Sequence, residues 1–154
     1  MSAYIYTVTM KMALSAATTQ TALVLKPASA GPLWLIDWEA TFDGSAAAAG
    51  LECQLITQTT DGTGTATPPT PSKWNRRNDR AAQFTTLWKL SAEGSLGVIL
   101  EHRYAQPFGG GFIKQYPLGT EPHAVESGDR FGFRFITPSG VTPNVALTVT
   151  VKEG

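Results

Sequence analysis

The stretch from Pro32 to Gly44, PLWLIDWEATFDG, constrains the fold more than any other part of the chain. Its large apolar side chains recur at every second residue, and this period of two indicates a β-strand with one buried face. The members of that face are Trp34, Ile36, Trp38, Ala40 and Phe42. Two Trp and one Phe on one face would bury a large apolar area. We therefore predict a central strand of the core, closed by the turn-forming pair Asp43-Gly44.

Short alternating segments separated by Gly, Pro and Asp-Gly turn signals continue along the chain. The other predicted strands are residues 4–12, 21–26, 51–59, 83–91, 95–104, 113–118, 123–126, 130–137 and 145–151. Segment 83–91 is ambiguous between a strand and a short helix, and we favour the strand. The alanine-rich segment 45–50 is interpreted as a loop. About nine or ten short strands, without a convincing helix or a repeat, are typical of an all-β sandwich or barrel.

We predict a single domain over residues 1–154, a jelly-roll-like β-sandwich with an N-terminal strand or arm. An immunoglobulin-like sandwich is the second choice of topology. The predicted core comprises Trp34, Trp38, Phe42, Leu55, Leu100, Phe133, Phe135, Leu147 and Val149. The single cysteine, Cys53, shares its parity with Leu51 and Leu55, so we interpret it as a small buried hydrophobic residue. One cysteine allows no internal disulfide.

The charge balance excludes some classes of partner. Lys and Arg together number 12, as do Asp and Glu, so the formal net charge is zero and no chain-wide basic footprint for nucleic acid is present. Charged residues make up only 16% of the chain, and near-zero net charge favours a protein that lives in an assembly. The opening residues lack the pattern of a secretory signal peptide, and no apolar run is long enough to span a membrane.

Two segments are candidates for partner binding. The apolar, β-prone segment 2–12 could act as an arm that completes a neighbour's sheet, with Tyr4 and Tyr6 as its aromatic contacts. The second segment, 60–80, is a long loop rich in Pro, Gly and Thr. It carries Trp74 beside the chain's densest basic cluster: Arg76, Arg77 and Arg80. Because Trp and Arg dominate binding hot spots, we predict that this loop anchors the protein to a partner.

Trp74 has other interpretations that the residues leave open. It could pack back over the sandwich edge, form a sugar platform, or stack on single-stranded nucleic acid. A carbohydrate-binding module would use exposed aromatic side chains, for which Trp74, Tyr104 and Phe108 are the candidates. Such a carbohydrate-binding module is our alternative function.

A search for catalytic patterns finds little. His102 and His123 stand in different predicted strands without metal-ligand spacing, so we predict no metal site. Asp37 and Glu39 lie two residues apart on one strand face, as glycosidase carboxylates can, but a solvated or subunit-facing surface is the simpler interpretation. Because no nucleophile–base, metal or cofactor pattern is present, we predict a non-enzymatic protein without a cofactor. An enzyme of cupin or glycosidase type is a more distant alternative.

The order of several motifs resembles that of small head proteins of tailed bacteriophages. YIYTVTM at residues 4–10 is followed by W-x-x-x-F-D-G at 38–44, QTTDGT at 58–63, FGGGFIKQYPLG at 108–119 and SGDRFGFRFITP at 127–138. The family comprises capsid decoration or auxiliary proteins with β-sandwich or jelly-roll folds, and it supplies no catalytic residues. The resemblance implies a structural protein on the capsid exterior of a virion, bound to a major capsid protein, often as a homotrimer.

Overall fold

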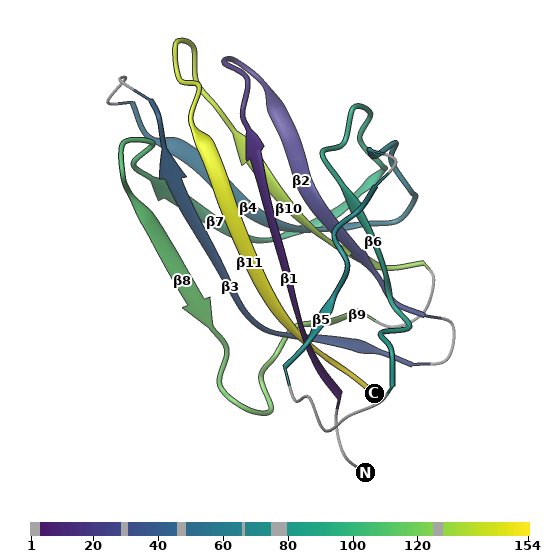
Figure 1. Cartoon of the computed structure of the whole chain (residues 1–154). Coiled ribbons are helices and arrows are strands. Elements are labelled where there is room, and N and C mark those ends of the chain that lie inside the picture. The colour runs from purple at the N-terminus through teal and green to yellow at the C-terminus, as the bar shows by residue number, and fades with distance from the viewer. Residues whose placement is uncertain (1–3, 29–30, 46–48, 66, 75–79, 125–127) are drawn as a thin grey trace.

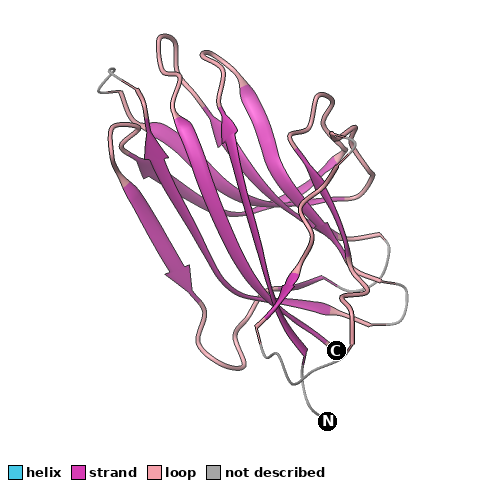
Figure 2. Cartoon of the chain, viewed as in Figure 1, coloured by secondary structure: helices cyan, strands magenta, loops and turns pink. Residues whose placement is uncertain are grey.

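The computed structural model describes residues 4–28, 31–45, 49–65, 67–74, 80–124 and 128–154. Within these ranges the chain forms strands, turns and loops and no helix (Figures 1 and 2). The strands form two antiparallel sheets that pack face to face as a β-sandwich, which confirms the predicted fold class.

Sheet A has the strand order β5-β1-β11-β3-β8, with the short β9 also paired to β3. Its strands are β1 (Tyr4–Ala13), β3 (Leu33–Asp43), β5 (Ser72–Lys73), β8 (Gly111–Gln115), β9 (His123–Ala124) and β11 (Asn144–Glu153). Sheet B has the order β6-β2-β10-β4-β7. Its strands are β2 (Thr19–Lys26), β4 (Leu51–Gln58), β6 (Thr85–Trp88), β7 (Leu96–Ala105) and β10 (Arg130–Ile136). The first long strand therefore pairs with the last, and β7 and β8 end their sheets on the same side of the molecule (Figure 1).

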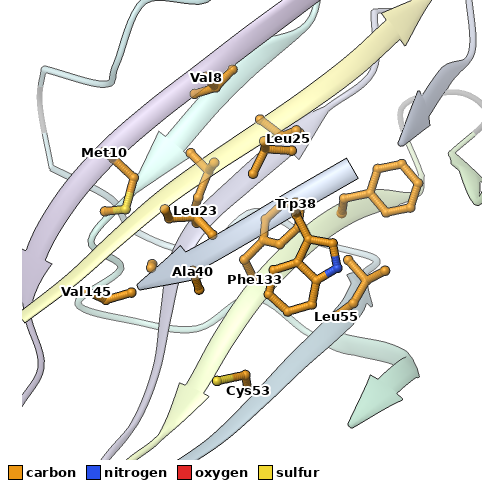
Figure 3. Close-up of a cluster of buried hydrophobic side chains, with 14 of the residues drawn as sticks. Val8, Met10, Leu23, Leu25, Trp38, Ala40, Cys53, Leu55, Phe133 and Val145 are labelled. Atoms are coloured by element: carbon orange, nitrogen blue, oxygen red, sulfur yellow. The ribbon is translucent and has the colours of Figure 1, made fainter. Parts of the chain in front are cut away.

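The core lies between the sheets and is built around Trp38 of β3. The Trp38 ring lies 4.8 Å from the Phe112 ring in an edge-to-face arrangement and 5.2 Å from the Phe133 ring of the opposite sheet. Leu23, Leu55 and Cys53 of sheet B close around the same cluster (Figure 3). Seven of the nine predicted core residues are buried: Trp38, Phe42, Leu55, Phe133, Phe135, Leu147 and Val149.

Trp34 departs from the prediction because β3 contains a bulge. The pairing of β3 with β11 shifts between Leu35, opposite Val151, and Asp37, opposite Thr150, so that Ile36 is an extra residue. Because successive side chains alternate between faces, one extra residue reverses the parity of everything before it. Leu33 and Leu35 are consequently buried, and Trp34 is half-buried on the outer face.

Leu100 is the second correction to the predicted core. It is 43% exposed, because Glu101 and Arg103 take the core-facing positions of β7, opposite Leu55 and Cys53, and a bulge leaves the adjoining Leu100 without a partner on β4. The predicted strand 95–104 does form, as β7, but its outer side chains face solvent.

The possible N-terminal arm is also corrected, since residues 4–13 are an integral strand. Every residue of β1 pairs with β11 of the same chain, and Tyr6, Val8, Met10 and Met12 point into the core. Residues 2 and 3 lie outside the described residues. Within its described residues, the long loop 60–80 contains β5, and Thr63 forms a bridge with Ala92.

Two turn features shape the strand ends. Gly44 adopts a φ of 84°, a conformation that glycine tolerates best, and its N–H donates to Asp43 Oδ1 at 2.8 Å, as the predicted Asp-Gly turn requires. The predicted strand 83–91 is shorter, running from Thr85 to Trp88. It ends there because Lys89 has a φ of 49°, outside the range of a strand.

Candidate partner-binding surfaces

Trp74 lies beside the N-terminal strand, fixed by its backbone. Its N–H donates to the carbonyl of Ile5 at 2.9 Å, which continues the β1–β5 pairing of Tyr6 with Lys73. The side chain itself is 69% exposed. The alternative in which Trp74 packs back over the sandwich edge is therefore wrong, and a large aromatic ring is presented to solvent from a hydrogen-bonded backbone.

A row of side chains crosses the outer face of sheet A from Trp74. Ile5 pairs with Lys152, Lys152 with Trp34, and Trp34 with His123. Directly opposite residues share a face of a sheet, so these side chains form one line, the Trp74–Trp34 row. Lys152 Nζ lies 4.9 Å from the Trp34 ring centroid. Trp74 and Trp34 are three strand spacings, about 14 Å, apart.

The two segments predicted to bind a partner, 2–12 and 60–80, contact each other through their described residues. The Arg80 guanidinium lies 4.6 Å from the Tyr4 ring centroid, and the Tyr6 hydroxyl donates to the Arg80 carbonyl at 3.0 Å. Together with the Trp74–Ile5 hydrogen bond, these contacts join the end of loop 60–80 to β1. Sequence reasoning treated the segments as separate, because only the sheet pairing brings them together.

The structure corrects the roles of Arg80 and Tyr6. Arg80 Nη2 donates to Glu153 of the same chain at 2.9 Å, so its charge is paired internally instead of awaiting a partner's carboxylate. Tyr6 is 1% exposed and packs edge-to-face on Phe84, so it belongs to the core. Tyr4 is half-buried beneath Arg80. The predicted site residues Arg76 and Arg77 lie outside the described residues.

A second surface, missed by sequence reasoning, is the edge strand β7. Its exposed apolar side chains, here called the β7 edge surface, are Leu96, Val98, Ile99, Leu100 and Tyr104, with exposures of 37–79%. Phe108, Ile113 and Leu118 are exposed in the segment that follows. Clusters of exposed apolar side chains mark interaction sites. The sequence feature that could have revealed this surface is the run from Val98 to Leu100, in which consecutive residues, and therefore both faces of the strand, are apolar.

His102 sits at the rim of this surface in a polar network. Its Nδ1 lies 2.6 Å from Glu52 Oε1, which also accepts a hydrogen bond from Gln54 Nε2 at 2.9 Å. The hydrogen bond from His102, and then that from Gln54, hold the pKa of the Glu52 carboxyl below its usual value. Arg134 in turn donates to Gln54 Oε1. The network joins β4, β7 and β10 across the outer face of sheet B.

The other candidates for chemistry are dispersed. Asp37 and Glu39 lie on the outer face of β3, opposite Thr150 and Thr148 of β11. Burial raises the pKa of the Cys53 thiol to about 12. Among the described residues, no group of three or more His, Cys, Asp and Glu side chains could hold a metal ion.

A hollow of about 420 Å³ lies over the ends of β1, β3 and β11. Its charged lining residues, Lys11 and Asp43, have opposite signs, so it favours neither anions nor cations.

The part of the chain that the structure describes contains no helix long and apolar enough to cross a membrane. No family model, no curated protein and no solved structure matches this chain.

Proposed function

We propose that this protein is a non-enzymatic structural component of a virion, a decoration protein that binds the outer surface of a phage head. The motif order that resembles small phage head proteins supports this proposal. The observation that carries it is Trp74, which is 69% exposed yet held by a backbone hydrogen bond to the first strand. A rigid scaffold that presents a large apolar ring suits a protein whose task is attachment.

The strand order supports a jelly-roll as the finer description of the fold. The long strands β1, β2, β3 and β4 alternate between the sheets, and the first and last strands are neighbours in sheet A. An immunoglobulin-like sandwich instead pairs its first two strands within one sheet. A jelly-roll is common among viral capsid proteins, which agrees with the proposed role.

In the proposed complex, the Trp74–Trp34 row contacts the major capsid protein. Trp74 inserts into an apolar pocket of the partner, beside Lys152, whose side chain is 27% exposed and pairs with Glu121 of the same chain at 3.7 Å. The Arg80–Glu153 pair holds the end of the loop in place for this contact. Repeated binding across a lattice strengthens a modest individual affinity through effective concentration.

A capsid-binding assay with purified capsids tests the proposal. Trp74→Ala should weaken binding at least about tenfold, because removing a hot-spot Trp costs about 2 kcal/mol or more. A second variant, Arg76→Ala with Arg77→Ala, tests the basic residues of the same loop. The matched control is Phe108→Ala, a similarly exposed aromatic residue in the β7–β8 loop, which should bind like the parent. If Trp74→Ala folds and decorates capsids as tightly as the parent, the proposed contact is wrong.

The competing proposal is a carbohydrate-binding module on a phage tail or fibre, and exposed Trp74 favours it as well. Its candidate rings are dispersed: Trp74 adjoins β1 near one edge of sheet A, whereas Tyr104 is on β7 and Phe108 precedes β8 at the other edge. A glycan platform would therefore rest on the Trp74–Trp34 row alone. Glycan-array binding that is lost on Trp74→Ala, together with unchanged capsid binding, would favour this alternative.

A further inference from the structure

Strand β7 is hydrogen-bonded to a neighbouring strand along one edge, and its other edge is open. It pairs with β4 along most of its length, from Leu96 to Ala105, and ends the strand order of sheet B. Within the described residues no strand pairs with its other side. Long, apolar edge strands promote pairing with another chain, and monomeric proteins usually protect them with Pro, bulges or inward charges. β7 has a bulge at Leu100 and the charged residues Glu101 and Arg103 on its core-facing side, but exposed Val98, Leu100 and Tyr104 still make the open edge largely apolar.

Two oppositely charged side chains on β7, Glu101 and Arg103, each have a buried polar atom without a hydrogen-bond partner among the described residues. Glu101 Oε1 accepts a hydrogen bond from the Tyr116 hydroxyl at 2.8 Å, but the buried Oε2 has no hydrogen-bond partner within the described part of the chain. The Arg103 guanidinium lies 4.8 Å from the Phe112 ring centroid, and its buried Nε likewise has no hydrogen-bond partner there. Glu101 and Arg103 therefore both retain hydrogen-bonding capacity on the edge strand.

We propose that β7 pairs antiparallel with β7 of a second copy of this chain, about a two-fold axis through His102. In this register Glu101 lies directly opposite Arg103 of the second copy, and Arg103 opposite its Glu101. Directly opposite residues have Cβ atoms about 5 Å apart, which suits a carboxylate–guanidinium pair. The two copies would thus form two reciprocal Glu101–Arg103 ion pairs across the axis.

The charges select this register over its neighbours. A shift that centres the axis on Glu101 places two like-charged Glu101 side chains opposite each other. A shift that centres it on Arg103 does the same for arginine. Like charges directly opposite destabilise a sheet, so both shifted registers are disfavoured. The selected register also places Leu100 opposite Tyr104 of the second copy, which covers part of the β7 edge surface.

The result is a continuous sheet of two copies of sheet B, an isologous contact with two-fold symmetry. This inference does not rest on the proposed function, because it uses only the β7 edge and its charges. It also differs from the trimer that the family resemblance implies, which would need a separate surface.

The experiment measures the oligomeric state of the full chain by sedimentation equilibrium, with folding verified by circular dichroism. The parent should be a dimer. Glu101→Arg and Arg103→Glu should each raise the dimer dissociation constant at least about tenfold, since each places like charges opposite each other. The charge swap, Glu101→Arg with Arg103→Glu, should return it to near the parental value. A monomeric or trimeric parent, or a swap no better than the single variants, overturns the proposal.

A second measurement does not depend on these charges. His102→Cys would place two thiols opposite each other at the axis, within the Cα separation that a disulfide accepts. Oxidation should yield a covalent dimer. The control Val98→Cys, which this register places opposite Gln106, should not cross-link. Equal cross-linking of the two variants, or none by either, contradicts the register.

Discussion

Arg80 Nη2 lies 2.9 Å from Oε1 of Glu153, a carboxylate that is only 2% exposed. The other oxygen of Glu153 accepts the backbone N–H groups of Gln83 and Phe84, each at 2.9 Å. A single side chain at the end of β11 therefore holds residues 80–84 against the sandwich. Because the same residues carry the contacts to Tyr4 and Tyr6, Glu153 supports the surface on which Trp74 stands.

Glu153→Gln should lower the free energy of unfolding by about 1–3 kcal/mol, since it removes the charge that Arg80 and two backbone N–H groups share. Chemical denaturation provides the measurement. The control is Glu39→Gln, an exposed residue on the outer face of β3, which should change stability by less than about 0.5 kcal/mol. Equal effects of the two substitutions would contradict a structural role for Glu153.

Trp38→Ala should cost about 3–5 kcal/mol, because it opens a cavity at the centre of the core. Trp34→Ala should cost clearly less, because the bulge at Ile36 places that ring half-buried on the outer face. Thermal or denaturant unfolding of the two variants compares them directly. If Trp34→Ala were the more destabilising, the position of the bulge would be wrong.

The Asp61 carboxylate should make stability depend on acid pH. Its hydrogen bond from Lys26, and then that from Arg130, lower the pKa of Asp61 below its ordinary value of 3.8. A group whose pKa is lowered by folding contributes stability above its unfolded pKa and loses it as the pH falls through the folded pKa. The advantage of the parent over Asp61→Asn should therefore be present at pH 7 and be lost progressively as the pH falls below about 4. Because Asp61 is 45% exposed, the effect should be small and should shrink in high salt. An advantage that stayed constant down to pH 2 would contradict it.

Cys53 should be unreactive in the folded protein. Burial raises the pKa of its thiol to about 12, so almost no thiolate exists at pH 8, and the side chain is fully buried. A chromogenic thiol reagent should label one equivalent in guanidinium chloride and almost none under native conditions. Rapid native labelling would contradict the core position.

Much of the fold could be predicted from local pattern. Alternation of apolar and polar residues in 4–12, 51–59 and 130–137 predicted three strands and their buried faces. A period of two arises because every second side chain of a half-buried strand faces the core. The Asp43-Gly44 turn followed from the tolerance of glycine for positive φ. Strand alternation and turn geometry depend on residues that are close in the sequence, so they can be predicted from the sequence.

The candidate surfaces could be predicted only in part. An exposed Trp74 was expected from its loop, but its contact with Ile5 and the meeting of Tyr4 with Arg80 arise from pairing between segments about 70 residues apart. Arg80 was expected to be free for a partner, because nothing local to residue 80 reveals Glu153.

The sequence by itself determined an all-β chain, the strands around Trp38 and the burial of Cys53, because these follow from side-chain polarity at a fixed period. The tertiary structure alone decided the side on which Trp34 lies and the exposure of Leu100. For Trp34 the reason is one bulge residue, Ile36, whose presence shows only in the register with β11. For Leu100 it is the register of β7 on β4, which gives the core-facing positions to Glu101 and Arg103 and leaves Leu100 as a bulge residue of the edge strand.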